Sequence, residues 1–327
     1  MRAAARRWKV RRQDVAPEPE LLDVAGLVRR RLAGDRSDSA TLALVIEGGG
    51  MRGVVSAAMA AALERAGVTE CLDLVVGTSA GSVNGAAVVA GTADAMATSY
   101  AEVFAGRREY ADPRRLITRA GPAVDAARIV AATDELLDLA RRALARPLIR
   151  FAAVATDVAT AQPVALEEHT DPAALLRALQ ASSTLPVVGG PPVDFRDRRW
   201  LDGGISDAVP VATARDLGAT HAIVLATRPA GNVPGWGPAD AMIERYLRRL
   251  NPDLASSYRA RPERYAEERA AIASGLHLGV ETLLLAPGPG DPVPGRMERD
   301  AEVLRQAQRA ADRTATMLID GWFARAA

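Results

Sequence analysis

From residue 41 onward the chain alternates apolar runs with helical patterns, and this alternation limits the folds that it can adopt. The run TLALVIE (41–47) is apolar without interruption from Leu42 to Ile46, as expected of a strand buried on both faces. Similar runs follow at 72–77, 149–156 and 221–228. Apolar strands separated by helices predict a mainly parallel sheet covered on both sides. We therefore expect a three-layer α/β/α fold.

Other elements are expected around this sheet. The segment QPVALE (162–167) is a candidate hairpin partner of the strand at 149–156, and 280–287 is a candidate further strand. Segment 107–148 is expected to be helical with breaks. Helical periodicity predicts helices at 21–33, 54–67, 82–91, 172–182, 209–219, 239–250, 262–273 and 296–318. The face of the first helix that should be buried carries Leu21, Val24, Ala25, Val28 and Leu32.

We expect one α/β domain with helical additions at both termini. Residues 1–40 are interpreted as a basic tail and an amphipathic helix, and 41–228 as the catalytic core. Residues 229–327 begin with the turn-rich stretch PAGNVPGWGPAD and continue with charged helical patterns. They are interpreted as a helical extension packed on the core, where a lid or an acyl groove could determine substrate choice.

Composition excludes several classes of protein. Hydrophobic residues make up 49% and charged residues 25%, as in soluble globular proteins. A net charge of +1 with 4% aromatic residues disfavours a nucleic-acid partner. Cys71 is the only cysteine, so an internal disulfide and a cysteine-rich metal site are excluded.

The N-terminal sequence bears on localisation. No stretch reaches 18 uninterrupted apolar residues, and the basic segment MRAAARRWKVRRQDVAPEPE is not followed by an apolar signal core. We expect a cytoplasmic protein. The basic segment is either a solvated tail or a means of peripheral docking on an anionic membrane surface.

Two motifs compete to explain the glycines of EGGGMRG (47–53). Gly48, Gly50 and Gly53 fit G-x-G-x-x-G between a strand and a helix, which favours a dinucleotide site. Such a site needs an acidic residue at the end of the next strand, to bind the ribose. That strand ends instead in Gly77-Thr78-Ser79, and Asp73 lies at its beginning. The dinucleotide interpretation is weakened accordingly.

The next strand ends in GTSAG, a G-x-S-x-G nucleophile elbow formed by Gly77, Thr78, Ser79, Ala80 and Gly81. One strand–helix–strand unit separates this elbow from the glycine loop. Both motifs should therefore lie at the carboxyl ends of neighbouring parallel strands and face one crevice. Ser79 is the candidate nucleophile.

With a nucleophile beside it, the glycine loop acquires a different role. Attack on an ester produces an oxyanion, which needs N–H donors already aimed at it. The amides of Gly49 and Gly50, at a helix N-terminus, can supply them, and the amide of Ala80 is another candidate. Arg52 adds a positive charge that suits a phosphate headgroup or the oxyanion, and an ordinary ion pair is the alternative.

A serine nucleophile needs a proton acceptor, and the chain has three histidines. His221 begins a predicted strand and should lie at the amino edge of the sheet, away from Ser79. His169 falls in a polar turn. His277 is not placed by the sequence, so a Ser79–Asp202–His277 triad stays open.

Asp202, in RRWLDGGISDAVPV, is the preferred proton acceptor because Gly203 and Gly204 permit a tight turn and leave its carboxylate unobstructed. A partly desolvated carboxylate can serve as a base directly. The alternative is a turn in which Asp and Gly are present for geometry alone. Asp157, at the end of FAAVATD, is interpreted as a structural helper at the same sheet edge.

The chain contains GGGMRG, GTSAG and DGG in this order, and these motifs resemble those of the patatin-like phospholipase family. The segments EGGGMRG and ASSTLP (181–186) are also similar to segments of the bacterial members of this family. The resemblance covers about residues 43–227. It implies a patatin-like fold with a Ser–Asp dyad and no histidine, in which Ser79 is the nucleophile and Asp202 the proton acceptor. It also assigns the oxyanion hole to the loop of Gly48, Gly49, Gly50, Met51, Arg52 and Gly53.

We therefore expect a lipid acyl hydrolase, of phospholipase A or carboxylesterase type, that acts on a lipid or ester substrate and needs no cofactor or metal. A thioesterase or acyltransferase using the same site is the alternative. So is a regulatory protein that has lost catalysis, although the dyad and the loop glycines are all present. Dinucleotide-dependent chemistry is a remote third possibility.

Overall fold

The computed structural model describes residues 23–118, 120–167, 171–233 and 235–324. Its centre is a nine-stranded sheet in the order β5-β6-β3-β2-β1-β7-β9-β8, with β4 paired to β3. The parallel strands are β1 (Leu42–Ile46), β2 (Leu74–Thr78), β3 (Arg150–Asp157), β7 (His221–Leu225) and β9 (Val280–Leu285). The antiparallel strands are β4 (Pro163–Leu166), β5 (Val193–Phe195), β6 (Arg198–Asp202) and β8 (Leu276–His277).

The side chains of β1 explain why both faces of the sheet are covered. Successive residues of a strand point to opposite faces. Leu42, Leu44 and Ile46 belong to one apolar core, whereas Ala43 and Val45 belong to the other, and all five are fully buried. A continuous apolar run therefore needs helices on both sides, and the expected three-layer α/β/α fold is confirmed.

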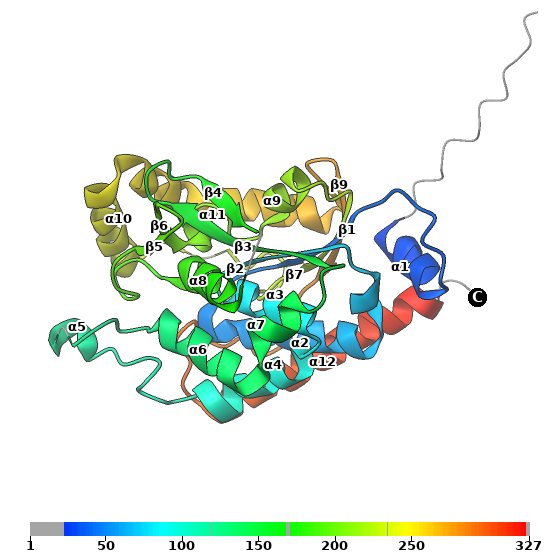
Figure 1. Ribbon diagram of the computed structural model, residues 1–327, viewed down its shortest axis with the longest axis horizontal. Helices are drawn as coiled ribbons and strands as arrows, with labels where there is room; N and C mark the ends of the chain where they lie inside the picture. Colours follow the sequence, from blue (N-terminus) through cyan, green and yellow to red (C-terminus); the bar gives the residue numbers. More distant parts are fainter. Residues whose placement is uncertain (1–22, 119, 168–170, 234, 325–327) are drawn as a thin grey trace, which may run out of the picture.

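The larger core lies under most of the helices (Figure 1). These are α1 (Val24–Leu32), α2 (Gly53–Arg65), α3 (Ala80–Ala90), α4 (Ala93–Ser99), α6 (Ala126–Leu137), α7 (Leu139–Leu144), α8 (Pro172–Ser183) and α12 (Ala301–Ala324). On the opposite face lie α9 (Val211–Asp216) and α11 (Pro252–Ala273), with α10 (Pro238–Leu250) packed on α11. The short α5 (Arg115–Thr118) projects from one end of the molecule in Figure 1.

The predicted strands and the β3–β4 hairpin are confirmed, but three helix boundaries were wrong. Helix α11 begins at Pro252, ten residues before the predicted start, and continues through Pro262. A proline inside a helix normally favours a break, and tertiary packing overrides that preference here because buried side chains lie on both sides of Pro262. Helix α9 is shorter than predicted, and α12 begins at Ala301 and not at 296.

The buried face expected for α1 is correct for Val24 and Val28 and wrong for Leu32, which is 37% exposed. Leu21 lies outside the described residues. Leu27 and Arg31 occupy the inner positions of the last turns. Arg31 is buried there because it pairs with Asp38 at 2.7 Å and with Asp73 at 2.6 Å, and polar pairing of this kind escapes a prediction based on hydrophobic periodicity.

The C-terminal third contributes to the sheet as well as to the helical layers. Strand β9 extends the sheet in parallel with β7, and α12 packs against α2. In the described part of the chain, no helix has the length and apolarity needed to cross a membrane.

Candidate active site

Ser79 lies on a strained turn between β2 and α3. Its backbone has φ 56° and ψ −129°, a conformation that L-residues rarely adopt. The turn is possible because a Cβ at Gly77 would overlap the Gly81 carbonyl oxygen, and one at Gly81 would overlap the Ile46 carbonyl oxygen. The sequence Gly-x-Ser-x-Gly is therefore needed here for backbone packing, and it presents the Ser79 side chain at the end of β2.

The glycine loop passes directly beside Ser79. A Cβ at Gly48 would come within 2.7 Å of the Thr78 carbonyl oxygen and 2.9 Å of the Ser79 Cβ. Within the described residues, no acceptor pairs with the N–H groups of Gly49 and Gly50, which lie at the N-terminal end of the Gly50–Arg52 turn and α2. These unpaired donors lie where an anion generated at Ser79 would need them.

Contacts between helices hold the loop in place. The Asn84 amide on α3 donates to the Gly53 carbonyl at 2.9 Å and to the Ser56 hydroxyl at 3.1 Å, and Tyr100 donates to Asn84 at 3.1 Å. All four residues are buried. The start of α2 is thus fixed to α3, the helix that follows Ser79.

Asp202 reaches the same place from the antiparallel strand β6. In the sheet, Thr78 pairs with Val154 of β3, and the next residue of β3, Ala155, pairs with Asp202. The residue that follows Thr78 is therefore at nearly the same level of the sheet as Asp202. Gly203 allows this approach because a Cβ there would overlap the Val154 carbonyl oxygen.

The carboxylate of Asp202 is buried and incompletely hydrogen-bonded. Its Oδ1 accepts from the Gly204 N–H at 2.8 Å, and its Oδ2 has no well-aligned partner in the described residues. Burial raises the pKa of Asp202, while the Ser79 hydroxyl, the Gly204 N–H and the charges of Arg296 and Arg261 oppose that rise. The hydroxyl is therefore near enough to affect the carboxylate, although no well-aligned hydrogen bond joins them. Hydrogen bonds of catalytic groups are often loose before substrate binds.

The segment ASSTLP connects the two candidate residues, a role that the sequence did not reveal. The Ser182 hydroxyl accepts from the Ser79 N–H at 2.9 Å and donates to the Val154 carbonyl at 2.6 Å. The Thr184 carbonyl accepts from the Asp202 N–H at 2.9 Å. The end of α8 thus orients the backbones of Ser79 and Asp202 together. A signal for this role is the pair of small polar residues at a predicted helix end.

The histidines lie away from this site or outside the description. His221 begins β7 opposite Leu42, at the amino edge of the sheet, as predicted. His277 pairs with Val280 at the start of β9, also at the amino edge, so the structure does not bring it to Ser79 or Asp202. His169 lies outside the described residues, as does the basic N-terminal segment 1–22. The triad with His277 is contradicted by this topology.

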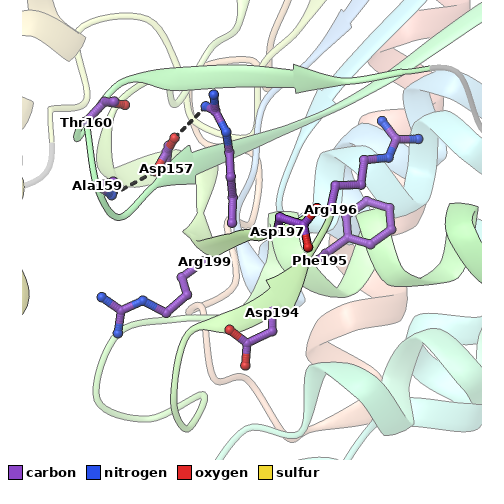
Figure 2. A pocket seen from close by; sticks show the side chains of 9 residues that line it. Asp157, Ala159, Thr160, Asp194, Phe195, Arg196, Asp197 and Arg199 are labelled. Atoms are coloured by element: carbon purple, nitrogen blue, oxygen red, sulfur yellow. Dashed lines mark hydrogen bonds and ion pairs between the residues drawn. The ribbon is translucent and has the colours of Figure 1, made fainter.

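Asp157 makes structural contacts, as interpreted from the sequence. It accepts from the Arg198 guanidinium at 2.8 Å and from the Ala159 N–H at 2.7 Å, and it is buried. Figure 2 shows it in a hollow lined by Asp157, Ala159, Thr160 and the β5–β6 hairpin residues Asp194–Arg199. Ser79 is not among the residues that line this hollow. The Asp157–Arg198 pair joins β3 to β6 and so supports the register of Asp202.

Arg52 and Glu47 connect the loop to Thr227, which follows β7, and to α11. The Arg52 Nε donates to the Thr227 hydroxyl at 3.1 Å, and its buried guanidinium does not line the cavity described below. Glu47 accepts from the Thr227 N–H at 2.6 Å and from the Tyr265 hydroxyl at 2.9 Å. Arg52 therefore serves the structure of the loop in this conformation, and Glu47 attaches α11 to it.

Ser79 and Asp202 open into one cavity of about 560 Å³, within the usual range for small-molecule sites. Gly48, Gly49, Gly50 and Met51 of the glycine loop line it, together with Thr78 and Ala80 of the elbow. Most of the wall is apolar and comes from α3, α4, segment 100–130 and the loop after α8. Its residues include Val83, Met96, Phe104, Ile129, Val130 and Leu185. A hydroxyl, a buried carboxylate and free N–H donors in a mainly apolar cavity are suited to acyl transfer.

Acidic residues and histidines elsewhere form no metal site in the described ranges, where no three His, Cys, Asp or Glu side chains are grouped to hold an ion. Asp73, the acidic residue considered for a ribose contact, immediately precedes β2 and accepts from Arg31 and from the Leu42 N–H. The structure therefore gives the glycine loop no ribose-binding partner at Asp73.

Comparisons with known proteins place this site in a family context. A family model described as "Patatin-like phospholipase" matches residues 44–215, more than half of the chain. YjjU, an uncharacterised protein of Escherichia coli K12, is 31% identical over 195 residues, which cover 58% of this chain and 52% of YjjU. The chain thus spans about half the length of this curated relative.

Similar solved structures are more distant. VipD from Legionella pneumophila has a TM-score of 0.40 at 12% identity, covering 87% of this chain and 67% of VipD. The human GIVD cytosolic phospholipase A2, in complex with methyl gamma-linolenyl fluorophosphonate, has a TM-score of 0.43 at 11% identity, covering 92% of this chain and 61% of the human chain. The family-model match, by contrast, includes Ser79, Asp202 and the whole glycine loop.

Proposed function

This chain belongs to the patatin-like phospholipase family, and on that premise we propose that it hydrolyses carboxylic ester bonds of lipids. Ser79 acts as the nucleophile and Asp202 as the general base, and the N–H groups of Gly49, Gly50 and Ala80 form the oxyanion hole. The strongest support is the register along one edge of β3, where Val154 pairs with Thr78 and the next residue, Ala155, pairs with Asp202, while β4 takes the opposite edge.

In the first half of the reaction the Ser79 hydroxyl attacks the ester carbonyl carbon while its proton moves to the Asp202 carboxylate. The negative charge that develops on the carbonyl oxygen is stabilised by the loop N–H groups and by the N-terminal ends of α2 and α3. The intermediate collapses when the leaving alkoxide takes the proton from Asp202. The products are an alcohol and an acyl ester on Ser79.

In the second half a water molecule attacks the acyl ester and transfers a proton to Asp202. Collapse of the second intermediate returns that proton to the Ser79 oxygen and releases a carboxylic acid. Burial supports this role because it raises the pKa of Asp202 above the usual aspartate value and so makes the carboxylate a better base.

We assign the acyl chain of the substrate to the apolar part of the cavity. Because two parts of the polypeptide line this cavity, we also divide the protein into a core and an extension. Residues 41–228 form the catalytic core and 229–327 an extension that closes part of the cavity. Support comes from Ile243 and Tyr258 of the extension, which line the cavity together with the core residues Tyr100 and Phe104.

The mouth of the cavity suits a lipid surface. Helix α5 contributes Leu116 to the cavity wall and leaves Ile117 87% exposed. Helix α10 contributes Ile243 and leaves Met242 52% exposed, and both helices lie at the same end of the molecule in Figure 1. Exposed apolar side chains continuous with an apolar cavity favour docking on a bilayer.

Ile117→Asp tests this docking. It should lower hydrolysis of phosphatidylcholine vesicles several-fold relative to hydrolysis of a soluble short-chain ester. Leu148→Asp is the matched control, because Leu148 is 92% exposed and does not line the cavity. If the ratio of vesicle hydrolysis to soluble-ester hydrolysis is the same in both variants and the wild type, docking through α5 is ruled out.

An alkyl fluorophosphonate probe tests the nucleophile. We expect covalent labelling of the wild type, no labelling of Ser79→Ala, and full labelling of Ser183→Ala. Ser183 is the matched control because it also lines the cavity, and its buried hydroxyl has no hydrogen-bond partner among the described residues. Labelling that survives in Ser79→Ala refutes the assignment. With short-chain esters and an added alcohol, release of the free acid distinguishes hydrolysis from acyl transfer.

A further inference from the structure

The charged residues around the cavity are unevenly distributed. Three acidic residues line it, Glu47, Asp202 and Glu298, against five arginines, Arg107, Arg228, Arg261, Arg296 and Arg299. The two acidic side chains outside the dyad already accept hydrogen bonds from other groups of the protein. Glu47 accepts from the Thr227 N–H and Tyr265, and Glu298 accepts from the N–H groups of Arg299 and Asp300. The wall is thus positively charged overall, although the ligand space is mostly apolar.

Arg261 is the most unusual of these arginines. Its residue is only 9% exposed, and its buried Nε has no hydrogen-bond partner in the described part of the chain. Its Nη2 reaches Asp240 at a long 3.4 Å, and Asp240 already accepts from the Tyr258 hydroxyl at 2.7 Å. The guanidinium stacks on the Tyr258 ring, 4.4 Å from its centroid. The guanidinium is therefore held in place while its Nε donor is unused. An unpaired buried donor of this kind destabilises the folded protein.

Two more arginines border the same space. The Arg296 carbonyl accepts from the Met51 N–H at 3.0 Å, which fixes its backbone against the glycine loop. No described residue accepts a hydrogen bond from the Arg296 guanidinium. The Arg228 Nη1 donates to Asn232 at 2.9 Å, and its carbonyl accepts from Arg269 at 3.1 Å. All three arginines follow residue 215, outside the segment that the family model matches.

Electrostatics indicate that the charges of Arg261 and Arg296 lie near each other and near Asp202. Burial and the positive charge of Arg296 both lower the pKa of Arg261. Arg296 and Arg261 in turn help to keep the pKa of Asp202 from rising further. An anion bound between the arginines would relieve both the mutual repulsion and the unpaired donor of Arg261.

We propose that Arg261, Arg296 and Arg228 form a binding site for a phosphate ester group at the polar end of the cavity, beside Asp202. Guanidinium groups bind phosphate oxygens through paired, charge-assisted hydrogen bonds, and the unused Nε of Arg261 supplies one of them. If the proposed function is correct, which this assignment of the ligand assumes, the phosphate belongs to the headgroup of the lipid whose ester faces Ser79. A free phosphate ester offers the same chemistry.

The site is tested by calorimetric titration of the full chain with sn-glycerol 3-phosphate and, separately, with glycerol. The phosphate should bind and glycerol should not. Arg261→Gln should weaken phosphate binding at least tenfold, about 1.4 kcal/mol, and Arg261→Lys should recover part of it. Arg259→Gln is the matched control, because Arg259 lies on the same helix, pairs with Glu244 and does not line the cavity. Equal binding in Arg261→Gln and wild type, or no binding to the wild type, overturns the proposal.

A second measurement identifies the source of the phosphate. We compare kcat/KM for phosphatidylglycerol and for diacylglycerol with the same acyl chains, both in detergent micelles. A headgroup site predicts that Arg261→Gln lowers the phosphatidylglycerol-to-diacylglycerol ratio about tenfold and that Arg259→Gln does not. If titration shows the site but the ratio is unchanged, the site takes a free phosphate ester and the headgroup assignment falls. If the wild type hydrolyses neither lipid, the proposed function fails while the titration still decides the site.

Discussion

The cavity is lined by two regions of different construction. The segment matched by the family model supplies Ser79, Asp202 and the glycine loop. Pairing of adjacent strands places Ser79 and Asp202, and contacts between α2 and α3 hold the loop. The region after residue 228 supplies Arg261 and Arg296, positioned by ring stacking and a single loop contact. Reactive groups need placement to a fraction of an ångström, whereas a charged wall acts over longer distances. The difference suggests that reaction chemistry and substrate selection are separable.

Glu47 shows where the two regions meet. It directly follows β1, precedes the glycines of the loop, and accepts hydrogen bonds from the Thr227 N–H and the Tyr265 hydroxyl of α11. The contact of Arg296 with Met51 is a second junction. The following predictions test how independent the two regions are, beginning with the largest expected effect.

Asp202→Asn should lower kcat for a soluble ester by roughly 10²–10⁴-fold, because it removes the proposed general base. It should also raise the melting temperature near neutral pH. Burial raises the pKa of Asp202, so the ionised carboxylate destabilises the folded state above that pKa, and neutral Asn removes this cost. Steady-state kinetics and thermal unfolding are the measurements. Full activity in Asp202→Asn would contradict the assignment of the base.

Gly81→Ala should destabilise the protein by about 1–3 kcal/mol and abolish most activity, because the new Cβ meets the Ile46 carbonyl and moves the elbow. Gly295→Ala in the C-terminal region is the control, since a Cβ there has no atom within 4 Å. Denaturant unfolding measures the difference. Similar stability losses in both variants would mean that the elbow is no more tightly constrained than the C-terminal region around Gly295.

Arg296→Gln should shift the acidic limb of the pH profile of kcat/KM to higher pH. The positive charge of Arg296 favours ionised Asp202, so its loss raises the pKa of the base further, and the base must be ionised to act. The loop contact is retained because it uses the Arg296 carbonyl. A neutral p-nitrophenyl ester is the substrate and Arg309→Gln, on α12, the control. An unshifted limb would show that the two regions are electrostatically independent.

The smallest effect is expected at Glu268 on α11. Burial and the neighbouring Asp207 carboxylate raise the pKa of Glu268 to about 8, against the opposing charge of Arg264. The folded state therefore holds a proton that the unfolded state releases, and stability falls as pH rises from the ordinary value near 4.5 to about 8. Glu268→Gln should flatten this part of the stability curve. An unchanged slope in unfolding experiments across that range would exclude this coupling.

Much of the fold could be predicted because its signals are local. Continuous apolar runs marked β1, β2, β3, β7 and β9, since a strand buried on both faces has no polar side. The elbow was recognisable because a strained turn at Ser79 needs glycine on both sides. The candidates Ser79 and Asp202 and the glycine loop could therefore be chosen from the sequence, and their catalytic roles stay predictions.

What the tertiary structure decided depends on residues far apart in the chain. The register of β3 with both β2 and β6 brings Asp202 to Ser79 across 123 positions, and no local pattern encodes such pairing. The same holds for Ser182, whose hydroxyl joins Ser79 to β3, and for Arg261, whose burial depends on Tyr258 and the cavity wall. The sequence determined the kinds of chemical group and the turns that carry them. Packing decided which groups meet, because burial and strand register are properties of the whole sheet.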